Sequence, residues 1–180
     1  MPVKYGSRRG QKIRWIVCHY PAWPCKSAAG LRDYYAVCGR SVSAHFAVDE
    51  DGAVQIVDCM DAAWHCATAG KTIYCDANNY NSIGVDLCDR KLHACGKLRA
   101  EDRDWYIPEA TLARAAHLIA GLMRDYRIDI AHVIRHFDVT HKLCPRPLVG
   151  DDINEFYGIT GNARWDQFKQ QILAIRGGFK

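Results

Sequence analysis

The sequence predicts an α/β domain in which a central, mostly mixed β-sheet is flanked by helices. Short apolar runs rich in β-branched residues alternate along the chain with longer segments whose apolar residues recur every three or four positions. This alternation is typical of a sheet covered by helices. The 180 residues are 49% hydrophobic and 24% charged, as in an ordinary globular protein, and no repeat or linker divides them. One domain over residues 1–180 is expected, with a core of about residues 13–176.

The N-terminal half is predicted to contain a strand, a helix and a hairpin. Residues 13–19 form an apolar run rich in β-branched and aromatic side chains, which indicates a buried strand. Residues 27–38 are predicted to form a helix with Ser27 as its N-cap. Residues 44–48 and 53–57 are predicted to pair as a hairpin, because the Asp-Gly step between them favours a tight turn.

The C-terminal half is predicted to add two strands and two helices. Residues 82–87 resemble another short strand. Pro108 opens a helix that is expected to run through Tyr126, since apolar residues recur there at helical spacing. Residues 128–136 alternate as a strand would, and residues 162–175 are predicted to form a closing amphipathic helix.

Composition excludes several classes of protein. No apolar run approaches the ~18–20 residues that a membrane span needs. The opening MPVKYGSRRGQKIRWIV has a basic flank but no apolar region with a small-residue cleavage site, so no secretory signal is expected. The net charge of +4 favours approach to an anionic polymer, but the basic residues are scattered and do not indicate nucleic-acid binding.

Nine cysteines are an unusual number for this length. An odd count leaves at least one thiol unpaired, and the chain is long enough to build a core without a disulfide framework. Without a signal, synthesis in a reducing cytosol is expected. Most of the cysteines are therefore predicted to be buried thiols: Cys18, Cys25, Cys38, Cys59, Cys66, Cys75, Cys88 and Cys95.

The densest group of chemically active side chains lies in residues 135–145, a loop expected after the last strand. It holds two imidazoles, a thiol, a carboxylate and an amine: His136, His141, Cys144, Asp138 and Lys142. His132 and His136 would suit a metal pair on a helix, but on the predicted strand they lie ~13 Å apart. His132 is therefore expected to be a core or surface histidine.

A metal site in this loop needs a further ligand from elsewhere. His19 is the best candidate because it ends the first buried strand, and sites in α/β sheets collect at the carboxyl ends of strands. Two neutral imidazoles and one thiolate suit Zn²⁺ and leave a fourth position for water. The alternative is that two unrelated histidines and a buried cysteine occur here by chance.

Five motifs occur in an order that resembles a known family. They are the strand ending in His19, the SAHF of residues 43–46 followed by Asp-Gly, the AWH of 63–65, the NSIGVD of 81–86 and the HFDVTHKLCP of 136–145. This ordered set is similar to the zinc-dependent N-acetylmuramoyl-L-alanine amidases, related to phage lysozyme amidases and peptidoglycan-recognition proteins, and closest to prophage endolysins. The resemblance spans roughly residues 13–144, and the WxxF of 165–168 is similar to the family's closing helix.

The resemblance implies a peptidoglycan-recognition-protein-like amidase fold and a catalytic site. One Zn²⁺ would be held by His19, His136 and Cys144. Lys142 would face the cleaved carbonyl, the alternative being an exposed loop lysine. Asp86 would act as general base, the alternative being a strand-end carboxylate in a structural hydrogen bond.

Two departures from the family's pattern concern the general base. The family commonly has Glu where this chain has Asp86, which places the carboxylate about one methylene further back. Some phage members have Tyr where this chain has Ala44. The resemblance therefore defines the metal ligands more closely than it defines the base.

The substrate groove is expected to be lined by Trp64, His65 and Asn81, the last within residues 78–81. An aromatic face suits sugar rings and amides, and Asn offers a donor together with an acceptor. The alternative places Trp64 in the core and makes His65 a partner of a metal ligand. Asp138 is expected either to orient a ligand histidine or to cap the following turn, and no role is assigned to His141.

The activity implied by the resemblance is hydrolysis of the amide between the lactyl group of N-acetylmuramic acid and L-alanine in peptidoglycan. The chain would be made in the cytoplasm and act on the bacterial cell wall as an endolysin or autolysin, with a separate holin-type pore as one route of export. The alternatives are a peptidoglycan-binding module without catalysis and a cytoplasmic amidase that recycles muropeptides. The sequence indicates no oligomeric state.

Overall fold

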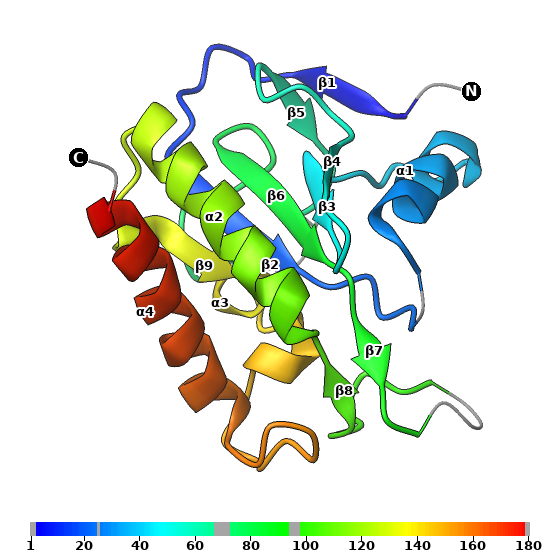
Figure 1. Ribbon diagram of the computed structural model, residues 1–180. Helices are drawn as coiled ribbons and strands as arrows, with labels where there is room; N and C mark the ends of the chain where they lie inside the picture. Colours follow the sequence, from blue (N-terminus) through cyan, green and yellow to red (C-terminus); the bar gives the residue numbers. More distant parts are fainter. Residues whose placement is uncertain (1–2, 25, 67–72, 94–97, 179–180) are drawn as a thin grey trace.

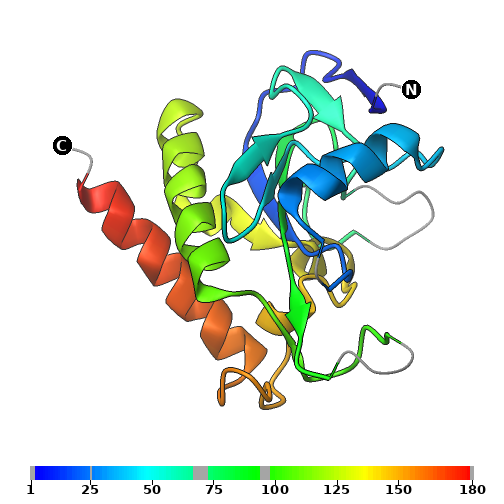
Figure 2. The same cartoon turned by 45° about the vertical axis from the view of Figure 1, so that its right-hand side comes forward.

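The computed structural model describes residues 3–24, 26–66, 73–93 and 98–178 (Figure 1). A five-stranded mixed sheet forms its centre, and helices cover both faces of the sheet (Figures 1 and 2). This confirms the predicted α/β class.

The central sheet has the strand order β4-β3-β6-β2-β9. Its strands β3, β6, β2 and β9 run parallel, and β4 pairs antiparallel with β3 through the predicted hairpin. The strands of this sheet are β2 Trp15–His19, β3 Phe46–Val48, β4 Ala53–Gln55, β6 Ser82–Leu87 and β9 Val133–Arg135. Two smaller two-stranded sheets pair β1 Tyr5–Ser7 with β5 Asp61–Ala63, and β7 Arg90–Lys91 with β8 Trp105–Tyr106.

The strands β2 and β6 form the buried centre of the sheet. Every residue of β6 is buried, as is β2 after its first residue. Such continuous burial is expected for parallel strands covered on both faces. Their register places His19 opposite Asp86, so both side chains lie at the carboxyl edge of the sheet.

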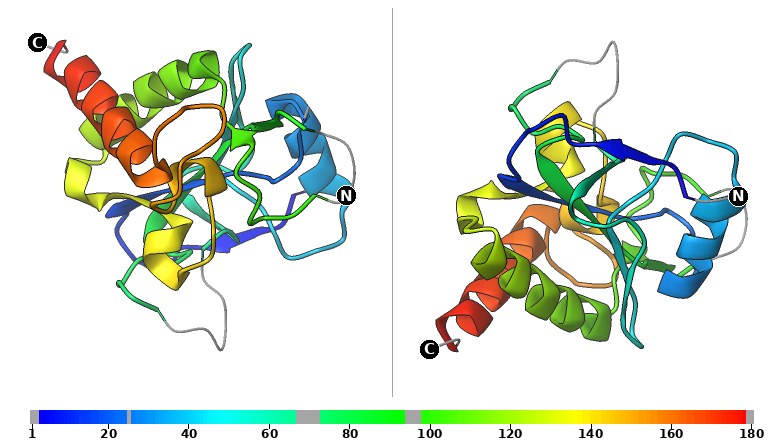
Figure 3. Two further views of the ribbon diagram at one scale, coloured as in Figure 1. Left: turned by 90° about the horizontal axis from the view of Figure 1, so that it is seen from below. Right: turned by 90° about the horizontal axis from the view of Figure 1, so that it is seen from above.

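One face of the sheet is covered by two long helices, α2 (Glu109–Asp125) and α4 (Gly161–Gly178). Their apolar side chains and the strand residues facing them share the main hydrophobic core, which includes Ile83, Leu112 and Phe168. The helix α1 (Ala28–Val37) lies on the opposite side, against β3 and β4 (Figures 2 and 3). The carboxyl edge of β2 and β6 is therefore left for loops and short helices.

The three predicted helices are confirmed. Ser27 caps α1, its Oγ accepting a hydrogen bond from the backbone N–H of Gly30 at 3.1 Å. Pro108 precedes α2, where its missing N–H costs no hydrogen bond. Trp165 and Phe168 are both buried on the inner side of α4.

The prediction of a strand over residues 128–136 is wrong for most of that segment. Asp129 accepts a hydrogen bond from the backbone N–H of Ala131 and starts a 3-10 turn, η1 (Ile130–His132), so only Val133–Arg135 pair with the sheet. The next residue, His136, begins a short helix, α3 (His136–Thr140). Local side-chain hydrogen bonds compete with the sheet here, and alternation of apolar residues does not reveal them.

The described cysteines are free thiols, and most are buried. Cys38 and Cys75 are only partly buried, so the expectation of burial is wrong for these two. Cys25 and Cys95 lie outside the described residues. Within the described residues, no helix is both long and apolar enough to cross a membrane.

Candidate metal centre

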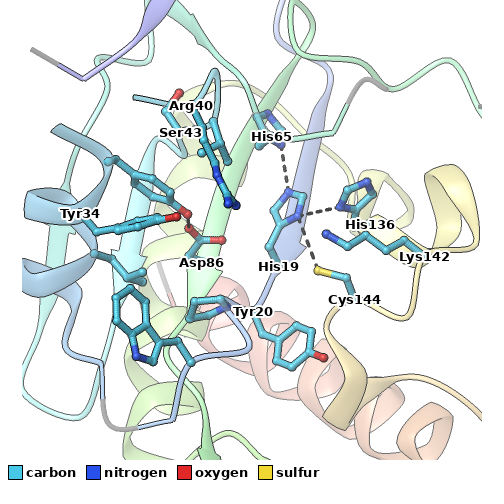
Figure 4. Close-up of a pocket in the computed structure, with 15 residues that line it drawn as sticks. His19, Tyr20, Tyr34, Arg40, Ser43, His65, Asp86, His136, Lys142 and Cys144 are labelled. Atoms are coloured by element: carbon cyan, nitrogen blue, oxygen red, sulfur yellow. Dashed lines mark hydrogen bonds between the residues drawn. The ribbon is translucent and has the colours of Figure 1, made fainter. Parts of the chain in front are cut away.

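Three side chains from distant parts of the chain converge at the carboxyl edge of the sheet (Figure 4). One ligand atom each from His19, His136 and Cys144 lies within 4.8 Å of the other two. Nδ1 of His19 is 3.1 Å from Nδ1 of His136 and 3.8 Å from Sγ of Cys144. All three residues are buried.

The backbone explains why these residues meet. His19 is the last residue of β2, and β9 pairs with β2 so that Cys18 lies opposite Arg135. His136 follows directly on β9 and therefore lies next to His19. The backbone N–H of Phe137 donates to the carbonyl of Cys144 at 2.9 Å, which returns the loop after α3 to the same place.

The donor set and its burial fit a cation. Burial lowers the pKa of His19 well below its usual value, the neighbouring His136 adding to the effect, so the imidazole is neutral and able to donate a lone pair. Burial also raises the pKa of the Cys144 thiol to about 12. A buried thiol becomes a thiolate when a cation replaces its proton. Two imidazole nitrogens and one sulfur form a donor set that zinc prefers.

Asp86 lies across from these three residues at the end of β6 (Figure 4). Its carboxylate accepts a hydrogen bond from the hydroxyl of Tyr35 at 2.6 Å, and both residues are buried. Burial raises the pKa of Asp86 to about 6, although the bond from Tyr35 and the charge of Lys142 act in the opposite direction. Sequence reasoning did not single out Tyr35, whose only signal was its place on the inner side of a predicted helix.

These groups share one pocket of about 340 Å³. His19, Asp86 and Lys142 line it from three different elements of the chain (Figure 4). The opposite wall includes Tyr34 and Arg40. The pocket therefore combines a candidate metal centre, a carboxylate and cationic side chains.

The N-acetylmuramoyl-L-alanine amidase family matches residues 9–147, which is most of the chain. The chain belongs to this family. It is 33% identical over 147 residues to the N-acetylmuramoyl-L-alanine amidase CwlL of Bacillus licheniformis, covering 77% of this chain and 38% of that protein. It is 29% identical over 193 residues to BlyA of Bacillus subtilis (strain 168), covering 99% of this chain and 47% of that protein. The chain thus spans less than half the length of these curated relatives.

Solved structures share the amidase fold. The catalytic domain of XlyA superposes with a TM-score of 0.67 at 23% identity, covering 95% of each chain. A mutant endolysin from Bacillus subtilis gives 0.66 at 26% identity, covering 96% of this chain and 94% of that one. AmiD from E. coli, in complex with anhydro-N-acetylmuramic acid-L-Ala-D-gamma-Glu-L-Lys, gives 0.57 at 22% identity and covers 88% of this chain and 57% of that one. These likenesses confirm the predicted fold.

The pocket beside the candidate metal centre is lined by one of the three residues predicted to bind substrate. His65 lines it, whereas Trp64 and Asn81 are not among its described lining residues. Trp64 lies against Gly6 and the ring of Tyr80. The amide of Asn81 is buried and bonds the backbone of residues 76 and 78.

The remaining polar residues in and near the loop of residues 135–145 contact other parts of the protein and not the candidate metal centre. Asp138 lies inside α3, where it accepts from the backbone N–H of Arg135 and pairs with its guanidinium, each at 2.8 Å. It therefore caps the start of α3 itself and not a following turn. His141 ends α3 with a positive φ of 56° and stacks on Tyr74 with ring centroids 3.6 Å apart. His132 packs against Trp15 and takes no part in the candidate metal centre.

Proposed function

We propose that this chain is a zinc-dependent hydrolase that cleaves the amide between the lactyl group of N-acetylmuramic acid and L-alanine in peptidoglycan. The observation that carries the proposal is the buried group of His19, His136 and Cys144, which shares a pocket with Asp86 and Lys142. Membership of the amidase family and the amidase names of its relatives support the same substrate.

The two imidazoles and the thiolate would hold the metal. Three protein ligands leave one position open, which is the arrangement of catalytic zinc sites. Zinc bound there supplies an activated water near neutral pH and polarises the substrate carbonyl. The chain's own residues then have to bind the substrate, accept the proton and stabilise the charge that develops on oxygen.

Asp86 is the proposed general base. With a pKa of about 6 it is ionised near neutral pH, yet it is basic enough to accept a proton from the attacking water. The same carboxyl can then return the proton to the departing L-alanine nitrogen. The hydrogen bond from Tyr35 holds Oδ2, which leaves the other oxygen available for proton transfer.

Lys142 is the proposed stabiliser of the developing negative charge. It lines the pocket two residues before Cys144 in the chain and faces the same space as the metal ligands (Figure 4). A cation directed at the carbonyl oxygen lowers the barrier because the charge on that oxygen grows in the transition state.

A binding module without catalysis is the weaker candidate. A module of this kind needs no metal, but the chain brings three ligand atoms together beside a carboxylate whose pKa is raised toward neutrality. We place the activity at the bacterial cell wall, with peptidoglycan as the partner. Export through a separate holin-type pore stays a prediction, and recycling of soluble muropeptides in the cytoplasm stays an alternative function.

Digestion of purified cell walls tests the proposal. The zinc-loaded chain is expected to release soluble peptides and to create new L-alanine amino termini without new reducing sugar ends. Metal analysis of the same preparation is expected to give about one zinc per chain. Release of reducing ends in place of amino termini, or full activity after exhaustive chelation, would contradict it.

A further inference from the structure

A chain of hydrogen bonds leads from the metal-facing His19 into the interior. Nδ1 of His19 faces the other two candidate ligands, and its Nε2 lies 3.0 Å from Nδ1 of His65. Nε2 of His65 lies 3.2 Å from Oγ of Ser82. Ser82 in turn donates to the backbone carbonyl of Asn78 at 2.5 Å.

The backbone carbonyl of Asn78 ends this series of hydrogen bonds and determines which nitrogen of each imidazole carries the proton. A carbonyl only accepts, so the Ser82 hydroxyl must donate to it and offers a lone pair to His65. Neutral His65 therefore carries its proton on Nε2 and presents a bare Nδ1 to His19. His19 must then hold its proton on Nε2, which leaves the lone pair of Nδ1 directed at the metal position.

The backbone around His65 is shaped to hold this ring. A Cβ on Gly84 would lie 2.6 Å from Cγ of His65, so the absence of a side chain in β6 makes room for the imidazole. The Asn79 side chain accepts from the backbone N–H groups of His65 and Cys66, each at 2.9 Å. The ring and the backbone that carries it are thus positioned independently of any ligand.

We propose that His65 is a positioning residue for the metal ligand His19, with Ser82 and the Asn78 carbonyl fixing its tautomer. The proposal rests on the proposed zinc-dependent function. In it, His65 holds the ligand His19 in place and does not bind the substrate directly. A ligand histidine whose second nitrogen is held in this way presents a pre-oriented lone pair, and loss of such a partner typically weakens metal binding about 10–100-fold.

Two measurements on the full chain test the proposal. Zinc affinity is measured by competition with a chromophoric chelator at pH 7, and the tautomer of His19 is measured in the metal-free protein by long-range ¹H–¹⁵N correlation. His65→Leu is expected to weaken zinc binding about 10–100-fold and to remove the preference for the Nε2–H tautomer of His19. His65→Gln is expected to lose less, because its amide oxygen can accept from Nε2 of His19.

Ser82→Ala and His132→Leu complete the series. Ser82→Ala keeps His65 but removes the group that fixes its tautomer, so zinc affinity is expected to fall between that of the native chain and that of His65→Leu. His132→Leu makes the same change at a histidine that packs on Trp15 outside the chain of hydrogen bonds, and native affinity is expected. Circular dichroism establishes that each variant is folded.

Native zinc affinity and an unchanged His19 tautomer in folded His65→Leu and Ser82→Ala would overturn the proposal. Failure of the native chain to bind zinc would instead overturn the proposed function. The tautomer of His19 in the metal-free variants still decides in that case whether His65 fixes the proton on Nε2 of His19, because that measurement needs no metal.

Discussion

The carboxylate of Asp86 on β6 accepts a hydrogen bond from the hydroxyl of Tyr35, a residue of α1. The motif around residues 81–86 predicted the position of Asp86 but not its partner Tyr35, which lies 51 residues away in the sequence. Helical spacing indicates which side of α1 faces inward, but it does not indicate what the inward side chains touch.

Replacing Tyr35 with Phe is expected to move the acid limb of the pH–rate profile. The Tyr35 hydroxyl donates to the charged form of Asp86 and so lowers the pKa of that carboxyl from the value that burial alone would set. Without the donor the pKa rises, less carboxylate is present at a given pH, and the acid limb of kcat/KM moves up by about one pH unit. Tyr5→Phe, at an exposed tyrosine, should leave the profile in place. An unmoved acid limb in Tyr35→Phe would show that Asp86 does not govern it.

Replacing Lys142 with Ala is expected to reduce kcat about 10²–10³-fold while zinc content stays the same, because the lost cation acts only on developing charge. Wall digestion under saturating substrate, together with metal analysis, measures both quantities. Lys169→Ala removes a lysine near Trp165 on α4 and serves as the matched control. Unchanged kcat in Lys142→Ala would contradict this role and favour the alternative that Lys142 is an exposed loop lysine without a catalytic function.

The strand β6 shows what a single element contributes. Its bounds were predicted correctly because its short apolar run is typical of a buried parallel strand. A glycine inside a strand often marks a close approach by another group, and at Gly84 that group is the ring of His65. The identity of the approaching ring comes from the fold alone.

Two Gly→Ala changes separate a crowded position from an open one. Gly84→Ala is expected to lower the free energy of unfolding by about 1–3 kcal/mol, since its Cβ would overlap the His65 ring. Gly121→Ala places the same methyl on α2, where it meets no atom within 4 Å apart from its chain neighbours and the adjacent helix backbone, and is expected to raise that free energy by about 0.5–1 kcal/mol. Urea unfolding measures both values. Equal stability of the two variants would contradict the close packing at Gly84.

At the scale of the whole molecule, the candidate metal centre ties together segments that are distant in sequence. His19 and Cys144 are 125 residues apart, yet their ligand atoms are 3.8 Å apart. A metal that binds the folded chain and not the unfolded chain therefore stabilises the entire fold.

Metal removal is accordingly expected to lower the thermal unfolding midpoint. Zinc at about 100 times its Kd adds about 2.7 kcal/mol to the free energy of unfolding. Calorimetry with and without a chelator measures the change, and Cys144→Ser is expected to lose most of it together with activity. Cys38→Ser, at a partly buried thiol that is not part of the candidate metal centre, should keep the native response to zinc. A midpoint that chelation does not move would contradict a metal centre at these residues.

The sequence by itself determined the α/β class, the long helices and the buried strands. Apolar periodicity and capping depend on residues that are close together in the sequence. Its ordered motifs also indicated the family and the residues that would hold a metal. Only the tertiary structure decided that residues 128–136 divide into a turn, a strand and a helix, that Tyr35 bonds Asp86, and that His65 bonds His19. These outcomes depend on which distant side chains become neighbours on folding, and that depends on sheet register and helix packing.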